Sequence, residues 1–167
     1  MNRSLLLSGL LLFLLSCGPS PPIPTPRRSG LDPKVTLGHA LVGATAIEVL
    51  SLDPTSGQNV RINSSFHGWP LRERVLVSAP LEVSSLAAAL ADDLSSRDLS
   101  VASPCEILPR YGIYVSGVHP LDLVISFECQ QAEAYAAGTA SGLGTYRISG
   151  ASQRALDPIL ARSNARP

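Results

Sequence analysis

The stretch from Tyr111 to Cys129 most constrains the fold, because apolar and polar residues alternate on both sides of a turn. A period of two is typical of a β-strand with one face in the core. On the C-terminal side of the turn, the residues that share the apolar face are Leu123, Ile125, Phe127 and Cys129. Asp122 and Glu128 fall on the opposite face, which we expect to be mostly in contact with water.

The loop between the two strands decides their register. A three-residue loop after Gly117 pairs Val115 with Leu123, Ile113 with Ile125 and Tyr111 with Phe127. A two-residue loop would instead turn Gly112 and Arg110 inward, because a slip of one residue inverts every side chain. We therefore predict an antiparallel hairpin whose loop has an odd length.

Cys105 and Cys129 flank this hairpin and have three interpretations. In the predicted register Cys129 faces Pro109, and extended chain covers about 3.3 Å per residue, so a disulfide requires residues 104–109 to curl back. Disulfides persist outside the cytoplasm, which favours a bridge. Two other interpretations remain open. Cys129 could be a buried thiol, or the cysteines could form a metal site together with His119 or Glu128.

The N-terminus predicts where the protein goes. Arg3 precedes the leucine-rich run Leu5–Leu15, which is too short to span a bilayer and ends in Leu14-Leu15-Ser16-Cys17. This pattern resembles a bacterial lipoprotein signal. The resemblance implies a signal peptide over residues 1–16, fatty acylation (palmitate or a similar chain) of Cys17, and a stable membrane anchor. Gly18, which is not Asp, implies the outer membrane facing the periplasm.

Two further regions follow the signal peptide. Residues 17–36 are proline-rich and predict a semi-rigid tether. Residues 37–167 have a length that suits one domain with one hydrophobic core.

For this domain we predict an α+β fold, with a small antiparallel sheet of four to five strands. Apolar residues at three- and four-residue steps predict an amphipathic helix over Pro80–Ser95, packed on one face of the sheet. A short C-terminal helix is expected over Ala155–Arg162, with Pro158 preventing a long extension upstream. The expected strands outside the hairpin are 45–52, 73–78 and 145–149, and residues 138–144 are expected to form a loop.

Composition and motifs exclude several functions. Basic and acidic residues balance at 13 each, and no basic cluster indicates nucleic acid binding. No catalytic, phosphate-binding or metal-binding motif is present, so we expect no enzyme activity, cofactor or metal. Candidate binding residues are His67 and Trp69, which flank Gly68, and Arg110. A structural role is the favoured interpretation of His67 and Trp69. Arg110 can pair with Asp122, with Glu128 or with an anionic ligand, and weak surface pairing is the commoner outcome.

Three further motifs carry a resemblance. Residues 66–70 (FHGWP), Pro109-Arg110 with Gly112, and residues 122–129 (DLVISFEC) are similar to a group of uncharacterised bacterial lipoproteins and secreted proteins. The similarity runs from Val60 to the C-terminus and implies fold and location, with no activity to transfer. Proteins of this group often have histidine at the position of Tyr111 and cysteine at the position of Ser126. This chain differs at both positions, which weakens the hypothesis that a Cys/His cluster performs chemistry here.

We therefore expect a non-enzymatic, lipid-anchored envelope protein that binds another envelope protein or a small ligand. The first alternative is a metal- or thiol-dependent enzyme that uses Cys105, Cys129 and a histidine. The second alternative is a structural or inhibitory lipoprotein.

Overall fold

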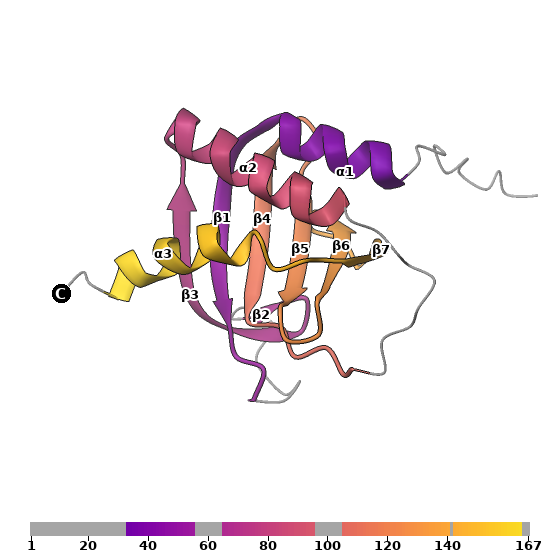
Figure 1. Cartoon of the computed structure of the whole chain (residues 1–167), viewed down its shortest axis with the longest axis vertical. Coiled ribbons are helices and arrows are strands. Elements are labelled where there is room, and N and C mark those ends of the chain that lie inside the picture. Colours follow the sequence, from indigo (N-terminus) through magenta and orange to yellow (C-terminus); the bar gives the residue numbers. More distant parts are fainter. Residues whose placement is uncertain (1–32, 56–64, 96–104, 141, 165–167) are drawn as a thin grey trace, which may run out of the picture. The chain divides into compact units, whose positions relative to one another are not determined.

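The predicted hairpin lies at the centre of a seven-stranded antiparallel sheet with the order β2-β3-β1-β4-β5-β6-β7 (Figure 1). The strands are β1 (Ala44–Leu52), β2 (Ser65–Phe66), β3 (Trp69–Val77), β4 (Tyr111–Gly117), β5 (Leu121–Ser126), β6 (Gln131–Ala136) and β7 (Gly142–Arg147). The α+β class is confirmed, but the expected four to five strands are too few. Strands β2 and β6 were not predicted, and β7 begins inside the expected loop. In β6 the inward positions are Ala132 and Ala134, which are fully buried but are weak β-formers.

The computed structural model describes residues 33–55, 65–95, 105–140 and 142–164, which fall in one unit, Leu31–Pro167. The predicted signal peptide, Cys17 and residues 18–32 of the predicted tether lie outside the described residues. Within the described part of the chain, no helix has both the length and the apolar character needed to cross a bilayer.

Among the described residues, three helices accompany the sheet, and of these only α2 (Pro80–Ser95) has the predicted bounds. Helix α1 (Pro33–Val42) begins inside the range predicted for the tether. Helix α3 (Gln153–Asn164) is longer than predicted, because Ser152 begins it by accepting the N–H groups of Ala155 and Leu156 at 3.0 and 3.1 Å. Pro158 therefore lies inside the helix and costs it one internal hydrogen bond.

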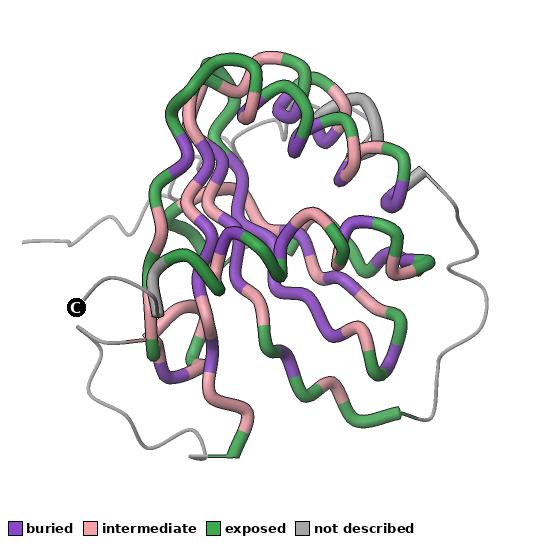
Figure 2. Tube along the Cα trace, turned by 60° about the vertical axis from the view of Figure 1, so that its left-hand side comes forward, coloured by how far each residue is buried: buried purple, intermediate pink, exposed green. Residues whose placement is uncertain are grey.

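All three helices contribute to one core on one face of the sheet, as Figure 2 shows by the buried residues in purple. The helix side chains in this core include Leu37, Leu41, Val83, Leu86, Leu90, Leu94, Leu156 and Ile159. They pack on alternate strand residues, among them Ile47, Val49, Ile113, Val115, Leu123 and Ile125. The predicted packing of the amphipathic helix on one face is thus confirmed.

The register of the hairpin differs from the prediction by two residues. Val115 pairs with Leu121, and Tyr111 pairs with Ile125, so five residues separate the paired positions. The odd loop length is confirmed, because the predicted faces are kept. The shift has a physical reason: it brings Leu121, only 1% exposed, into the core beside Val115.

The opposite face of the sheet is shielded from water along β5, so the expectation of a mostly water-exposed face is wrong for this strand. All six residues of β5 are buried, including Asp122 and Val124. The turn between β2 and β3 covers this face, since the Phe66 ring would lie 2.7 Å from a Cβ added at Gly112. Gly112 therefore provides the space into which the Phe66 ring packs, and a second, smaller core forms around Leu50, Leu52 and Val124.

Candidate functional site

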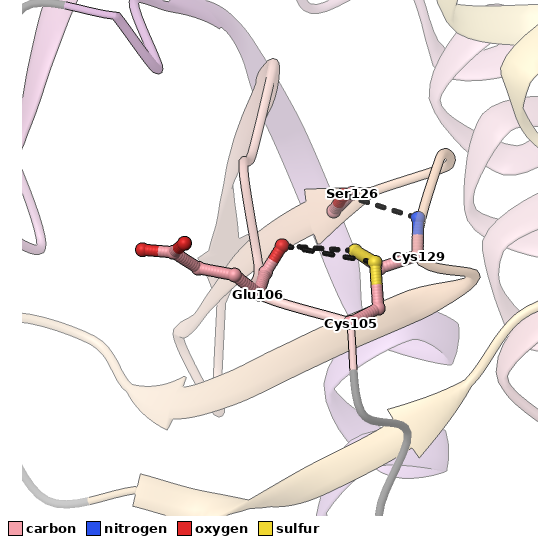
Figure 3. The surroundings of a disulfide bond; sticks show 4 residues. All are labelled: Cys105, Glu106, Ser126 and Cys129. Atoms are coloured by element: carbon pink, nitrogen blue, oxygen red, sulfur yellow. Dashed lines mark hydrogen bonds between the residues drawn. A yellow bond between two sulfur atoms is a disulfide. The ribbon is translucent and has the colours of Figure 1, made fainter.

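Cys105 and Cys129 are joined by a disulfide, with a Cα–Cα distance of 5.7 Å (Figure 3). Strand β5 ends at Ser126, and the turn that follows brings Cys129 back toward Cys105. The N–H of Cys129 donates to the Ser126 hydroxyl oxygen at 3.4 Å, which holds this turn. The cysteines meet because the register is shifted by two residues and because a turn follows Ser126, where the expected continuous strand was wrong.

The disulfide restricts the chemistry open to the two sulfur atoms. The carbonyl oxygen of Glu106 lies 3.0 Å from Sγ of Cys129 and 3.7 Å from Sγ of Cys105. A bridged sulfur is neither a thiolate nucleophile nor a thiolate metal ligand. Among the described residues, no group of three or more His, Cys, Asp or Glu side chains is arranged to hold a metal ion.

His67 lies in the β2–β3 turn, and its side chain contacts residues of the sheet that this turn covers. Its Nε2 lies 2.9 Å from Oδ2 of Asp122, and its ring stacks on Tyr135 with a centroid distance of 4.0 Å. The Phe66 ring contacts the His67 ring edge-on at 4.8 Å. His67 adopts a left-handed backbone with φ of 49°, which non-glycine residues rarely adopt. These contacts hold the turn on the sheet and support a structural role for His67.

Asp122 and Tyr135 are polar groups enclosed by this turn. A second hydrogen bond to Asp122 comes from the N–H of Gly138, which donates to Oδ2 at 3.2 Å. Tyr135 donates its hydroxyl to Glu133 at 2.6 Å, and burial together with this bond raises the pKa of Tyr135. The phenol therefore stays neutral at physiological pH. Trp69 is half-buried against the second core, which again supports a structural role.

Arg110 lies instead in a surface hollow of about 330 Å³ at the end of β1 and the start of β4. The hollow is lined by Ser51, Leu52, Pro54, Thr55, Arg72, Arg110, Tyr111 and Leu160. The side chains of Arg72 and Arg110 are 59% and 66% exposed. Of the three candidate binding residues, only Arg110 thus lines this hollow. Arg72 was not a candidate, because it lies 38 positions away in the chain.

Each arginine at the hollow has one carboxylate partner. Arg110 donates through Nε to Glu128 at 2.7 Å, and Arg72 donates through a terminal nitrogen to Asp53 at 3.0 Å. The pairing of Arg110 with Glu128 is one of the pairings that the sequence suggested. A guanidinium carries five N–H donors, so one carboxylate leaves it able to bind a further oxygen.

Tyr111 forms the wall beside Arg110. Its hydroxyl donates to the Asp157 carboxylate on α3. Burial and this hydrogen bond raise the pKa of Tyr111 to about 12. The phenol is therefore neutral at physiological pH, and its hydroxyl occupies one oxygen of the Asp157 carboxylate.

Asp93 is a buried polar residue that the sequence did not single out, since it lies next to the apolar stripe of α2. Its side chain is 2% exposed and accepts four hydrogen bonds, from the N–H and hydroxyl groups of Ser149 and Ser152. Burial by itself raises the pKa of Asp93, but these hydrogen bonds outweigh it, and the pKa is lowered from 3.8. Asp93 thus holds the segment that leads into α3.

No family model matches this chain, and no match was found among curated proteins or solved structures.

Proposed function

We propose that this chain is a lipid-anchored protein of the bacterial cell envelope, facing the periplasm from the outer membrane. Its α+β domain binds a ligand that carries carboxylate groups, either a small molecule or an acidic segment of another envelope protein, and it catalyses no reaction. The observation that carries the binding role is the hollow beside Arg72 and Arg110.

The chemistry of the hollow favours an anionic ligand. Two exposed guanidinium groups line a hollow of about 330 Å³ together with hydroxyl groups and apolar side chains. Guanidinium groups match carboxylates in a planar, two-point geometry, and apolar surface beside them excludes water from the contact. The disulfide supports this arrangement, because it ties Cys105 to the turn that carries Glu128, the partner of Arg110.

The same contacts favour binding over the thiol- or metal-dependent alternative. Both cysteines of the described chain are consumed in the bridge, and His67 is committed to Asp122 and Tyr135. An enzyme of that kind would need the bridge reduced and His67 released from its packing. The proposed lipid anchor is supported by the lipoprotein-like signal sequence, whose last residues lead into Cys17.

Replacing Cys17 by alanine is expected to abolish acylation and release the protein from the membrane fraction, because the thiol is the attachment point. The measurement is the mass of the N-terminal peptide from wild-type and variant protein, with fractionation of the same cells. Gly18→Asp is the matched control and is expected to keep the acyl chains. A wild-type peptide with an unmodified Cys17 would contradict the anchor.

Glutarate, a small dicarboxylate, serves as a probe of the hollow. We expect it to shift the side-chain N–H resonances of Arg72 and Arg110 in the NMR spectrum, and not that of Arg154, an exposed arginine on α3. The double variant Arg72→Gln/Arg110→Gln is expected to bind about tenfold more weakly, since each lost charge-assisted hydrogen bond weakens binding. Equal shifts at all three arginines, or none, would contradict the proposed ligand class.

A further inference from the structure

One end of the sheet gathers four connecting segments that are far apart in the sequence. Because neighbouring strands run antiparallel, β1 begins where β3 and β4 end and where β5 begins. β6 also ends here, because it pairs antiparallel with β5. The segments are residues 42–46, 78–81, 116–120 and 136–140, at the upper end of the strands in Figure 1. We call them the uncharged end.

The uncharged end contains no Asp, Glu, Lys or Arg in its four segments, although these residues make up 16% of the chain. His119 is its one ionisable side chain. The opposite end of the same strands carries the two ion pairs Arg72–Asp53 and Arg110–Glu128. The ion pair Arg162–Glu82 directly follows the segment 78–81, so the absence of charge holds for the four segments themselves.

Apolar side chains project from the uncharged end. Val42, Leu81 and Val118 are 88%, 87% and 80% exposed, the highest values among the large apolar residues of the described chain. They adjoin β1, β3 and β4, which are neighbours in the sheet. Single exposed apolar residues are ordinary on protein surfaces, but apolar residues gathered on an uncharged surface indicate a contact.

Five polar groups of these segments bond within the protein. The N–H groups of Gly43, Ala137 and Gly138 donate to the carbonyl oxygens of His39 and Pro120 and to the Asp122 carboxylate, respectively. The hydroxyls of Thr45 and Thr139 donate to the carbonyl oxygens of Ser116 and Ala136. Removing water from a polar group costs little when the group already has a partner, so these five groups can be desolvated at little cost.

We infer that the uncharged end rests on the lipid bilayer, with Val42, Leu81 and Val118 entering the boundary between headgroups and acyl chains. This inference relies on the proposed acylation of Cys17. It goes further by giving the domain an orientation, in which the hollow beside Arg110 faces away from the bilayer.

Attachment at Cys17 keeps the uncharged end within reach of the bilayer. Residues 18–32 separate Cys17 from Pro33, and a proline-rich spacer that advances about 3.1 Å at each of these sixteen steps covers about 50 Å. The uncharged end can therefore reach the surface to which Cys17 is attached. Once the chain is anchored, a second contact is intramolecular, so three apolar side chains suffice for an attachment that would be negligible in solution.

A bilayer fits this surface better than a protein partner does. Protein interfaces take most of their binding energy from Trp, Tyr and Arg, while Leu and Val are under-represented among the strongest contributors. The four segments contain none of Trp, Tyr and Arg. Val and Leu side chains gain free energy at a lipid boundary in proportion to the apolar area that leaves water, and they need no shaped pocket there.

The test uses the full-length acylated protein in vesicles of phosphatidylethanolamine and phosphatidylglycerol. Val118→Cys introduces a thiol for a fluorescent probe, because Cys105 and Cys129 are bridged and Cys17 is acylated. We expect lipids brominated near the headgroup boundary to quench this probe roughly threefold more than a probe at Arg147→Cys, the matched control at the opposite end. Equal quenching at both positions would overturn the orientation.

A second variant tests the contact itself. Val42→Asp/Leu81→Asp places charges at two highly exposed positions, so it leaves the core unchanged. It is expected to lower quenching at position 118 to the level of the Arg147→Cys control. Unchanged quenching would overturn the role of these side chains.

The failures of the two proposals are distinguishable. A Cys17 peptide without acyl chains removes the anchor and overturns both the proposed localisation and the orientation. An acylated chain whose probe at position 118 stays in water overturns the orientation alone. A probe that becomes shielded only when an envelope protein is added also overturns it, in favour of a protein contact.

Discussion

Asp93→Ala is expected to lower the free energy of unfolding by about 4 kcal/mol, the largest effect that we predict for a single substitution. The carboxylate is buried and accepts the N–H groups of Ser149 and Ser152 as well as their hydroxyls. Alanine leaves the two backbone donors without their acceptor, and the N–H of Ser152 belongs to a buried residue that water does not easily reach. The start of α3 then loses its support on α2.

The measurement is urea unfolding at pH 7 of wild-type protein, Asp93→Ala and Asp92→Ala. Asp92 is the matched control, because it is the neighbouring aspartate on α2 and is exposed. Its replacement is expected to change stability by less than about 0.5–1 kcal/mol. Equal effects at the two positions would show that the hydrogen bonds of Asp93 contribute nothing.

The same carboxylate predicts a dependence of stability on pH. Because its pKa in the folded protein is lowered from 3.8, Asp93 stabilises the fold at pH values above its ordinary pKa. This stability is lost as the pH falls through the lowered pKa and the folded carboxylate takes up a proton. Asp93→Asn, which has no such titration, is expected to show a smaller loss of stability below pH 4 than wild-type protein.

Replacing both cysteines of the bridge by serine is expected to cost about 3 kcal/mol, the second largest effect. The bridge joins residues separated by 24 positions, and it restricts the unfolded chain more than the folded one. Wild-type protein treated with a thiol reductant is expected to lose the same amount. The measurement is the free energy of unfolding of Cys105→Ser/Cys129→Ser against oxidised and reduced wild-type protein.

Mass spectrometry provides the control for this experiment. The wild-type domain is expected to be lighter than its reduced form by two hydrogen atoms, and the serine variant is expected not to change on reduction. A variant as stable as the oxidised protein would contradict a stabilising bridge. Two free thiols in protein from the periplasm would contradict the bridge and return attention to the thiol-dependent alternative.

Several elements could be predicted because short-range patterns specify them. The apolar stripe of α2 and the proline at its first position predict Pro80–Ser95, the bounds that are observed. Alternation predicts the faces of β4 and β5 correctly, although their register differs by two residues. Strand β6 could not be predicted in this way, since Ala132 and Ala134 have no β preference and are strand residues because β5 and β7 lie beside them.

The hollow was predictable only in part. Arg110 was a candidate binding residue, but nothing in a linear sequence places Arg72 beside it. His67 and Trp69 were candidates as well, and the structure engages both in packing rather than in the hollow. A histidine beside a glycine gives no sign that its partner will be an aspartate 55 residues away.

The amino-acid sequence by itself determined the α+β class, the main amphipathic helix and the faces of the central hairpin, and it predicts a lipoprotein signal at the N-terminus. These features depend on residues within a few positions of one another, and local periodicity reports them. Only the tertiary structure decided that Asp122 and Asp93 are buried, that Cys105 meets Cys129, and that four uncharged segments share one end of the sheet. Each of these depends on strand order and on turns that bring distant residues together, and burial and charge at a position are set by those neighbours.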